Sequence, residues 1–148
     1  MGIELPPAPT PFGSYLETLQ TGNLLFLSGM LPVVGHKPKY LGRLGKELDA
    51  KAGQDAARTA VLSGLAAARQ HLGSLDKIRR IVRLGVFIAT DGDFFDQPRV
   101  ADGASDLLRD IFGPEGLAVR MVLGVASLPL GMPVEVELIF ETGEEAER

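Results

Sequence analysis

The 148-residue chain contains no cysteine, no tryptophan and only two histidines, His36 and His71. The missing cysteine excludes disulfides, a thiolate nucleophile and every zinc or iron–sulfur site built on cysteine ligands. Two histidines are too few for a three-histidine metal site within one chain, and we assign neither of them a role. Because phosphate-binding glycine loops and nucleophile elbows are absent as well, we expect no metal and no organic cofactor.

Positive charge and long apolar runs are also scarce. Lysine and arginine number 15 against 19 aspartate and glutamate residues, which gives a formal net charge of −4. Nucleic-acid binding normally needs a clustered basic surface, and Arg79, Arg80 and Arg83 are the nearest approach to one. The apolar runs fall far short of the roughly 20 residues that cross a bilayer, and the first residues do not resemble a signal peptide. We therefore expect a cytoplasmic protein without membrane or nucleic-acid partners.

The overall composition is that of a globular protein, with 45% hydrophobic and 23% charged residues. One domain is expected, because domains cluster at about 100–150 residues. Four prolines in residues 1–13 prevent regular structure there. We predict an extended arm over residues 1–13, a folded domain over residues 14–142 and a frayed tail over residues 143–148.

Hydrophobic periodicity and turn residues predict the order ββαβαββ within one α+β domain, with both helices on one face of a single mixed sheet. The expected strands are Tyr15–Gln20, Leu24–Leu27, Ile78–Thr90, Val119–Ser127 and Val134–Glu141, and the expected helices are Asp49–Leu72 and Gln97–Phe112. Residues Met30–Gly45 are expected to be a loop because glycine and proline punctuate them.

The predicted elements differ in what their faces carry. The first helix is rich in alanine and glycine, which favours close packing on the sheet, and Gly73 fits the position just after its end. Simple alternation in the strand Ile78–Thr90 places Val82, Leu84, Val86 and Ile88 on one face and Ile81, Arg83, Gly85 and Phe87 on the other. The sheet face without helices is expected to carry Phe87, Val122 and Ile139. An uncovered apolar face predicts association between copies of the chain.

Arg120 interrupts an otherwise apolar predicted strand. A guanidinium there is costly to bury without an anion. One interpretation is an internal ion pair, or a side chain that extends past the sheet edge. The other is a clamp for a ligand carboxylate, which arginine binds through two parallel hydrogen bonds.

Glu135 and Glu137 share one face of the last predicted strand. They are either part of a solvated strand face, or one of them orients a water molecule or moves a proton. A simple hairpin centred near Leu130 and Gly131 would pair Glu135 near Ala126, about six residues or roughly 20 Å from Arg120. The two side chains would then share a site most easily if a neighbouring subunit contributed one of them.

A C-terminal motif and several earlier residues carry a family resemblance. The motif is Arg120-x-x-x-x-Val125-x-x-Leu128-Pro129-x-x-x-x-Val134-Glu135-x-Glu137, and the earlier residues are Tyr15, Gly22, Ser28 and Gly29. Together they resemble the RidA/YjgF family of imine deaminases, many of which are described as endoribonuclease L-PSP-like. The resemblance covers about Tyr15 to Glu141 and has the features of a divergent branch.

The resemblance implies a chorismate-mutase-like fold and a homotrimer, with a central β-barrel and a cleft at each subunit interface. It implies hydrolysis of 2-enamine and 2-imino acids to 2-keto acids and ammonia without a cofactor. Arg120 matches the family's carboxylate-binding arginine, and Glu135 matches its water-positioning glutamate. The matching pocket positions are Tyr15, Ser28, Gly29, Asp102 and Val122.

Two positions depart from the family pattern: Val122 replaces a frequent cysteine, and Asp102 replaces a frequent asparagine. They favour, as an alternative, a trimer that binds or senses a small carboxylate such as a keto acid without turnover. An endoribonuclease is the less favoured third hypothesis, because the chain is acidic and lacks a histidine pair for acid–base chemistry.

Overall fold

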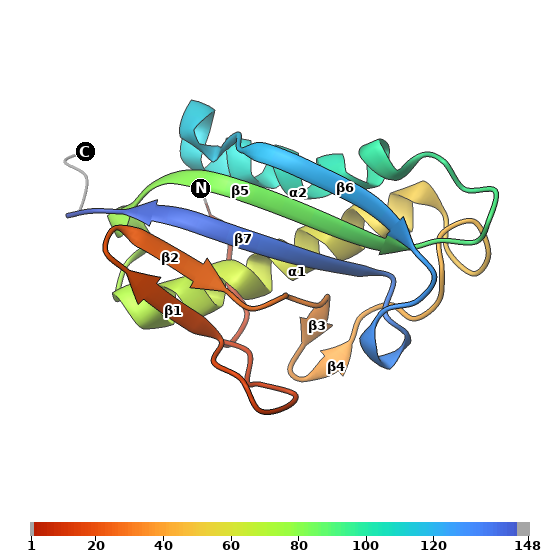
Figure 1. The fold of residues 1–148 in the computed structure, drawn as a ribbon, viewed down its shortest axis with the longest axis horizontal. Coiled ribbons are helices and arrows are strands. Elements are labelled where there is room, and N and C mark those ends of the chain that lie inside the picture. Colours follow the sequence, from red (N-terminus) through yellow and green to blue (C-terminus); the bar gives the residue numbers. More distant parts are fainter. Residues whose placement is uncertain (1, 145–148) are drawn as a thin grey trace.

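In a computed structural model that describes residues 2–144, a five-stranded sheet packs against two α-helices that lie on one of its faces (Figure 1). Its strands are β1 (Thr18–Thr21), β2 (Leu24–Leu27), β5 (Ile78–Ala89), β6 (Val119–Val125) and β7 (Val134–Thr142), and the helices are α1 (Ala50–Leu72) and α2 (Gln97–Phe112). The predicted α+β class with a mixed sheet is confirmed. Residues 145–148, which form most of the predicted tail, lie outside the described residues.

Shorter elements connect the main ones. The predicted loop Met30–Gly45 contains a small antiparallel ladder of β3 (Val33–Val34) and β4 (Lys37–Pro38). Single 3₁₀ turns occupy Leu75–Lys77, Gly113–Gly116 and Pro129–Gly131. The first strand begins at Thr18, later than predicted, because the chain bends at Gly13–Tyr15, where the Tyr15 N–H donates to the Gly13 carbonyl.

The sheet order is β1-β2-β7-β5-β6, in which β5 and β6 are parallel and the other neighbours are antiparallel. The predicted hairpin between the last two strands is therefore wrong: β6 and β7 lie on opposite sides of β5 (Figure 1). Residues 126–133 carry the chain around the end of β5, and Leu130 adopts a positive φ of 61° within this turn. The longest strand, β5, pairs with β7 on one side and, from Arg83 to Ala89, with β6 on the other.

Helix α1 has the boundaries and the close packing that its sequence predicts. The Asp49 side chain accepts the Ala52 N–H at 2.9 Å and caps the first turn. Gly73 closes the last turn with a φ of 88°, a conformation that favours glycine. At Gly64, a Cβ would lie only 3.0 Å from Leu138 Cδ1 of β7, so the missing side chain allows the helix to approach the sheet.

The core lies between the helices and the sheet. Leu84, Val86 and Ile88 of β5 are buried there as predicted, together with alternate residues of β7. The predicted face of Ile81 is wrong, because the β5–β7 register shifts between Ile81 and Arg83. This bulge turns Ile81 into the core.

Within residues 2–144, no helix covers the other face of the sheet, which is toward the viewer in Figure 1. Phe87 and Ile139 are half-buried on it. The prediction that Val122 also lies on this face is wrong, because Val122 pairs with Val86 and packs against the core on the helix side. Its neighbours Val119, Met121 and Leu123 take the uncovered face instead, with Val119 70% exposed. Among the described residues, no helix is both long and apolar enough to cross a membrane.

Candidate functional site

A pocket of about 500 Å³ lies where the chain leaves β2 and where β7 begins. Three segments distant in sequence form it: the N-terminal arm, the residues after β2, and the turn that leads into β7. Most of its lining is apolar, and the residues are Phe12, Gly13, Tyr15, Ser28, Gly29, Leu31, Pro129, Leu130 and Glu135. The structure thus brings together four predicted site residues: Tyr15, Ser28, Gly29 and Glu135.

Glu135 supplies the carboxylate of this pocket. Its side chain packs so tightly over Gly29 that a Cβ on residue 29 would lie 2.8 Å from Glu135 Cδ and nearer still to Oε2. The carboxylate has no hydrogen-bond or ion-pair partner among the described residues. Burial raises the pKa of Glu135 above its usual value of 4.5, because desolvation disfavours the charged form. A carboxyl group whose charged form is disfavoured in this way holds a proton more readily than an exposed carboxyl group, which suits it to accept and return one.

Ser28 and Tyr15 hold the pocket wall through hydrogen bonds. The Ser28 hydroxyl donates to the Leu16 carbonyl, and its N–H donates to the Glu17 carbonyl at 2.9 Å. The Tyr15 hydroxyl accepts the Phe12 N–H at 2.9 Å. These bonds tie the N-terminal arm to the segment after β2, so both sides of the pocket have defined positions.

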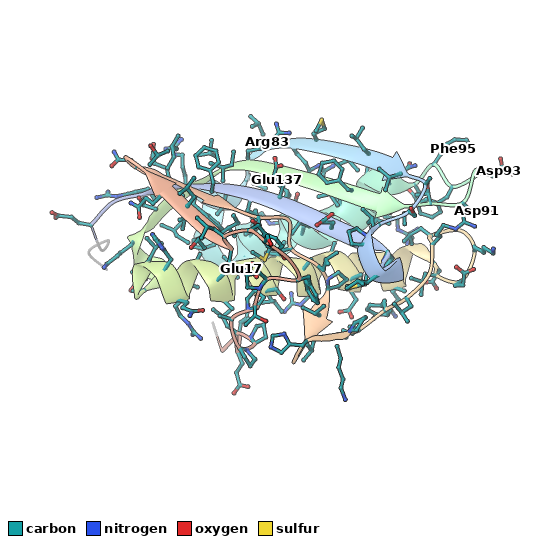
Figure 2. All side chains as sticks on the ribbon, turned by 60° about the horizontal axis from the view of Figure 1, so that its bottom comes forward. Glu17, Arg83, Asp91, Asp93, Phe95 and Glu137 are labelled. Atoms are coloured by element: carbon teal, nitrogen blue, oxygen red, sulfur yellow. The ribbon has the colours of Figure 1, made fainter. Side chains whose placement is uncertain are left out.

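Glu137 behaves differently from Glu135, although both point toward the uncovered sheet face. Its Oε1 accepts from Arg83 Nε of β5 at 2.9 Å, and Figure 2 shows the two side chains above the sheet. The residue pattern left open which of the two glutamates moves a proton, and the family resemblance pointed to Glu135. The ion pair commits Glu137 to a structural contact and leaves Glu135 as the candidate.

Arg120 lies on β6, the edge strand at the other side of the sheet. Its Nη1 donates to Asp102 Oδ1 at 2.8 Å and to Ser105 Oγ at 3.1 Å, both on α2. The Arg120 side chain is 27% exposed, and that of Asp102 is 50% exposed. The internal ion pair, one of the two interpretations of Arg120, is therefore present.

The remaining predicted residues form a second group, apart from the pocket. Arg120 pairs with Leu84 and points to the helix side, whereas Glu135 pairs with Phe87 and points to the uncovered side. The two side chains therefore lie on opposite faces of the sheet, with β5 between their strands. Asp102 and Val122 lie with Arg120. The prediction that Arg120 and Glu135 lie apart within one chain is therefore confirmed. The reason given for it, a hairpin between the last two strands, is wrong.

One residue near the pocket was missed from the sequence. Glu17 precedes β1 and borders a small void behind the pocket that also touches Tyr15 and Gly29. Burial raises the pKa of Glu17 as it does that of Glu135. Figure 2 labels its side chain near the N-terminal segment. A glutamate beside a predicted strand has no sequence signal that separates it from surface glutamates, so only the three-dimensional arrangement could have identified it.

The described residues include no group of three histidine, aspartate or glutamate side chains that could hold a metal ion. A family model described as "YjgF/chorismate_mutase-like, putative endoribonuclease" matches residues 1–142. The chain belongs to the YjgF/chorismate mutase-like family.

Individual relatives agree with this family membership. The chain is 39% identical over 142 residues to Protein TCP17 of Trypanosoma cruzi, which covers 95% of this chain and 89% of the relative. It is 28% identical over 138 residues to a 2-iminobutanoate/2-iminopropanoate deaminase of Dermatophagoides farinae, covering 93% and 92%. A solved structure from Shewanella oneidensis that carries the same endoribonuclease description superposes with a TM-score of 0.91 at 34% identity, covering 95% of this chain and 93% of that one.

Proposed function

We propose that this YjgF family member hydrolyses reactive 2-enamine and 2-imino acids to 2-keto acids and ammonia, in clefts between the subunits of a homotrimer. The observation that carries the proposal is the unpartnered, half-buried Glu135 carboxylate at the edge of an apolar pocket. The name of the Dermatophagoides farinae relative, 2-iminobutanoate/2-iminopropanoate deaminase, supports the same chemistry.

The chemistry requires little from the protein. The carbon of a C=N bond is already electrophilic, so a water molecule needs only to be positioned and to lose a proton as it attacks. Glu135 would accept that proton and deliver it to the nitrogen, which gives a carbinolamine. When the C–N bond breaks, the remaining hydroxyl proton also moves to the nitrogen, which departs as ammonia. Water supplies the oxygen of the 2-keto acid, and the 2-enamine form first takes up a proton at carbon and loses one from nitrogen to become the imine.

The substrate carboxylate needs a cation, and the described residues that line the pocket include none: they are Glu135 together with apolar and neutral polar residues. Arg120 can meet the pocket only if a second copy presents its β6 edge there. Val119, Met121 and Leu123 on the uncovered face supply apolar surface that association would bury. We propose that the trimer closes around this face, with the sheets as a central barrel, so that each cleft combines Glu135 from one subunit with Arg120 from the next.

The test uses the full chain with a dehydratase that converts threonine to 2-iminobutanoate in situ, while 2-oxobutanoate formation is followed. The wild type is expected to accelerate the last step. Arg120→Ala and Glu135→Gln are each expected to lower kcat/KM by about 100-fold or more, the usual size of a lost charge clamp or general base. Glu137→Gln is the matched control, since it removes a neighbouring carboxylate that is held by Arg83.

Two results would reject deamination. One is no acceleration by the wild type, and the other is an Arg120→Ala variant as active as the wild type. If the wild type gives no turnover but is stabilised against heat by 2-oxobutanoate in an Arg120-dependent way, the second candidate function, a carboxylate-binding trimer, replaces the first. Asp102, which pairs with Arg120 and replaces the family's frequent asparagine, favours that candidate, because it changes the surroundings of the arginine while the arginine itself is kept.

A further inference from the structure

The hydrogen bonds of Arg120 are all on one side of its guanidinium. Nη1 carries two N–H groups, and it donates to both Asp102 Oδ1 at 2.8 Å and Ser105 Oγ at 3.1 Å. This nitrogen is therefore fully used. Nε and Nη2 have no partner among the described residues.

The unused side has a particular geometry. In a planar guanidinium, the Nε–H and one Nη2–H point in parallel, away from the Cδ side where Nη1 lies. Two parallel N–H groups match the two oxygens of a carboxylate and bind it side-on. The contacts of Nη1 therefore leave free the pair of donors that best recognises a carboxylate.

The two acceptors come from a rigid element. Asp102 and Ser105 are three residues apart on α2, so they lie on the same helix face. Neighbouring residues Ala101 and Ala104 are buried against the core, which fixes the helix relative to the sheet. Arg120 itself is mostly covered, with 27% of its side chain exposed. A long, flexible side chain is thus held at its tip by two groups of fixed position.

We propose that Asp102 and Ser105 are positioning residues, which hold Nη1 of Arg120 so that its Nε–Nη2 edge binds the substrate carboxylate side-on. This inference rests on the proposed function, because it takes Arg120 as the carboxylate site. It changes the expected role of Asp102, which does not touch the substrate but orients the residue that does.

The opposite effect of Asp102 is also physically possible, and it gives the proposal a clear alternative. A negative charge 2.8 Å from the guanidinium weakens the attraction of Arg120 for a second anion. If this repulsion outweighed the positioning, removal of Asp102 would strengthen ligand binding. The two effects have opposite signs, and the aspartate-to-asparagine change separates them, since the amide oxygen accepts the same hydrogen bond without the charge.

The experiment compares the full-length wild type with Asp102→Ala, Asp102→Asn, Ser105→Ala and Arg120→Lys. Calorimetry measures the Kd of 2-oxobutanoate, and the coupled assay measures KM and kcat separately. Asp106→Ala is the matched control, because Asp106 lies on the same helix and makes only an exposed ion pair with Arg109 at 3.5 Å. Thermal melts confirm that each variant is folded, which is expected because Asp102 is half exposed.

Positioning predicts that Asp102→Ala raises both Kd and KM by about tenfold with kcat within about twofold of the wild type, as when one orienting charged hydrogen bond is lost. Asp102→Asn should stay within about twofold of the wild type, and Ser105→Ala should have a smaller effect than Asp102→Ala. Arg120→Lys should bind poorly, because an ammonium group lacks the paired donors.

Several outcomes overturn the proposal: tighter or unchanged binding in Asp102→Ala, an Asp102→Asn variant as weak as Asp102→Ala, or no binding of 2-oxobutanoate by the wild type. The failure of the proposed function is distinguishable from these. If 2-oxobutanoate binds with the expected dependence on Asp102 and Arg120 but no imine is hydrolysed, the positioning role stands and deamination is rejected.

Discussion

Two regions of the molecule, the pocket that contains Glu135 and the β6 edge that carries Arg120, hold their charged side chains in opposite ways. In the pocket, a half-buried carboxylate packs over Gly29 without a polar partner, and burial raises its pKa. At the edge, the Arg120 side chain is 27% exposed, and Asp102 and Ser105 satisfy one side of its guanidinium. The charged form of Glu135 is therefore disfavoured within its own chain, whereas the charge of Arg120 is partly compensated by Asp102.

This difference shows which group is poised for which role. An unpaired, desolvated carboxylate destabilises its charged form, and folds rarely keep such a group without a functional reason. A guanidinium that is fixed on one side and open on the other is suited to holding a ligand still. Neither region is a complete site, and within one chain they lie on opposite faces of the sheet.

The largest expected effect comes from combining the two regions across subunits. Arg120→Ala and Glu135→Gln chains, each inactive alone, are unfolded together and refolded as a mixture. If each cleft takes Glu135 from one subunit and Arg120 from the next, random mixing restores both residues in about a quarter of the clefts of a ring-shaped trimer. The 2-oxobutanoate assay should then recover about a quarter of wild-type activity, starting from almost none.

A mixture that stays as inactive as its parents would show that the two regions do not meet at a subunit boundary. The control is a mixture of wild type with the doubly substituted chain, because random pairing again leaves about a quarter of the clefts intact. Light scattering on each mixture confirms its mass. Monomers at micromolar concentration would contradict the proposed architecture directly.

A second prediction concerns the contact between Gly29 and Glu135. In Gly29→Ala, the added methyl group displaces the Glu135 carboxyl, whose Cδ lies 2.8 Å from the new Cβ position. Because the displaced group is the end of a flexible side chain, the fold should tolerate the change. We expect kcat to fall by about tenfold or more, as for a misplaced general base, while the melting temperature changes little. Gly92→Ala is the control, since nothing lies within 4 Å of that Cβ position; equal activity in both variants would show that the contact does not matter.

The fold was largely predictable from the sequence because its strongest signals are local. Alanine and glycine spacing, Asp49 and Gly73 set the limits of α1, and alternation in β5 identified most of its buried face. Strand pairing was not predictable in the same way. Nothing local in residues 126–133 distinguishes a hairpin from a turn around β5, and the bulge near Val82 inverted the expected face of Ile81.

The same limit applies to the site. The pocket positions Tyr15, Ser28, Gly29 and Glu135 came from the family resemblance, and the structure places them around one cavity. The partner of Arg120 did not follow from residue types, because Asp102 on a separate helix could equally have faced water. Which glutamate is unpaired was also undetermined, since Glu135 and Glu137 have the same alternation and differ only in the nearness of Arg83.

The smallest expected effect is on stability, and it tests the desolvation of Glu135 directly. The folded-state pKa of Glu135 is raised above its unfolded value, so the protonated form stabilises the fold below about pH 4.5 and that contribution is lost as pH rises through the folded pKa. Glu135→Gln carries no charge at any pH, so it escapes the loss. Its melting temperature should equal that of the wild type near pH 4 and exceed it by about 3 °C at pH 7.5. Glu137→Gln should show no such gain, because it breaks the 2.9 Å ion pair with Arg83. The opposite result is a Glu135→Gln variant that matches the wild type at pH 4 but melts below it at pH 7.5. In that case the carboxylate has a favourable partner in the assembled protein, and the contrast with Arg120 does not hold.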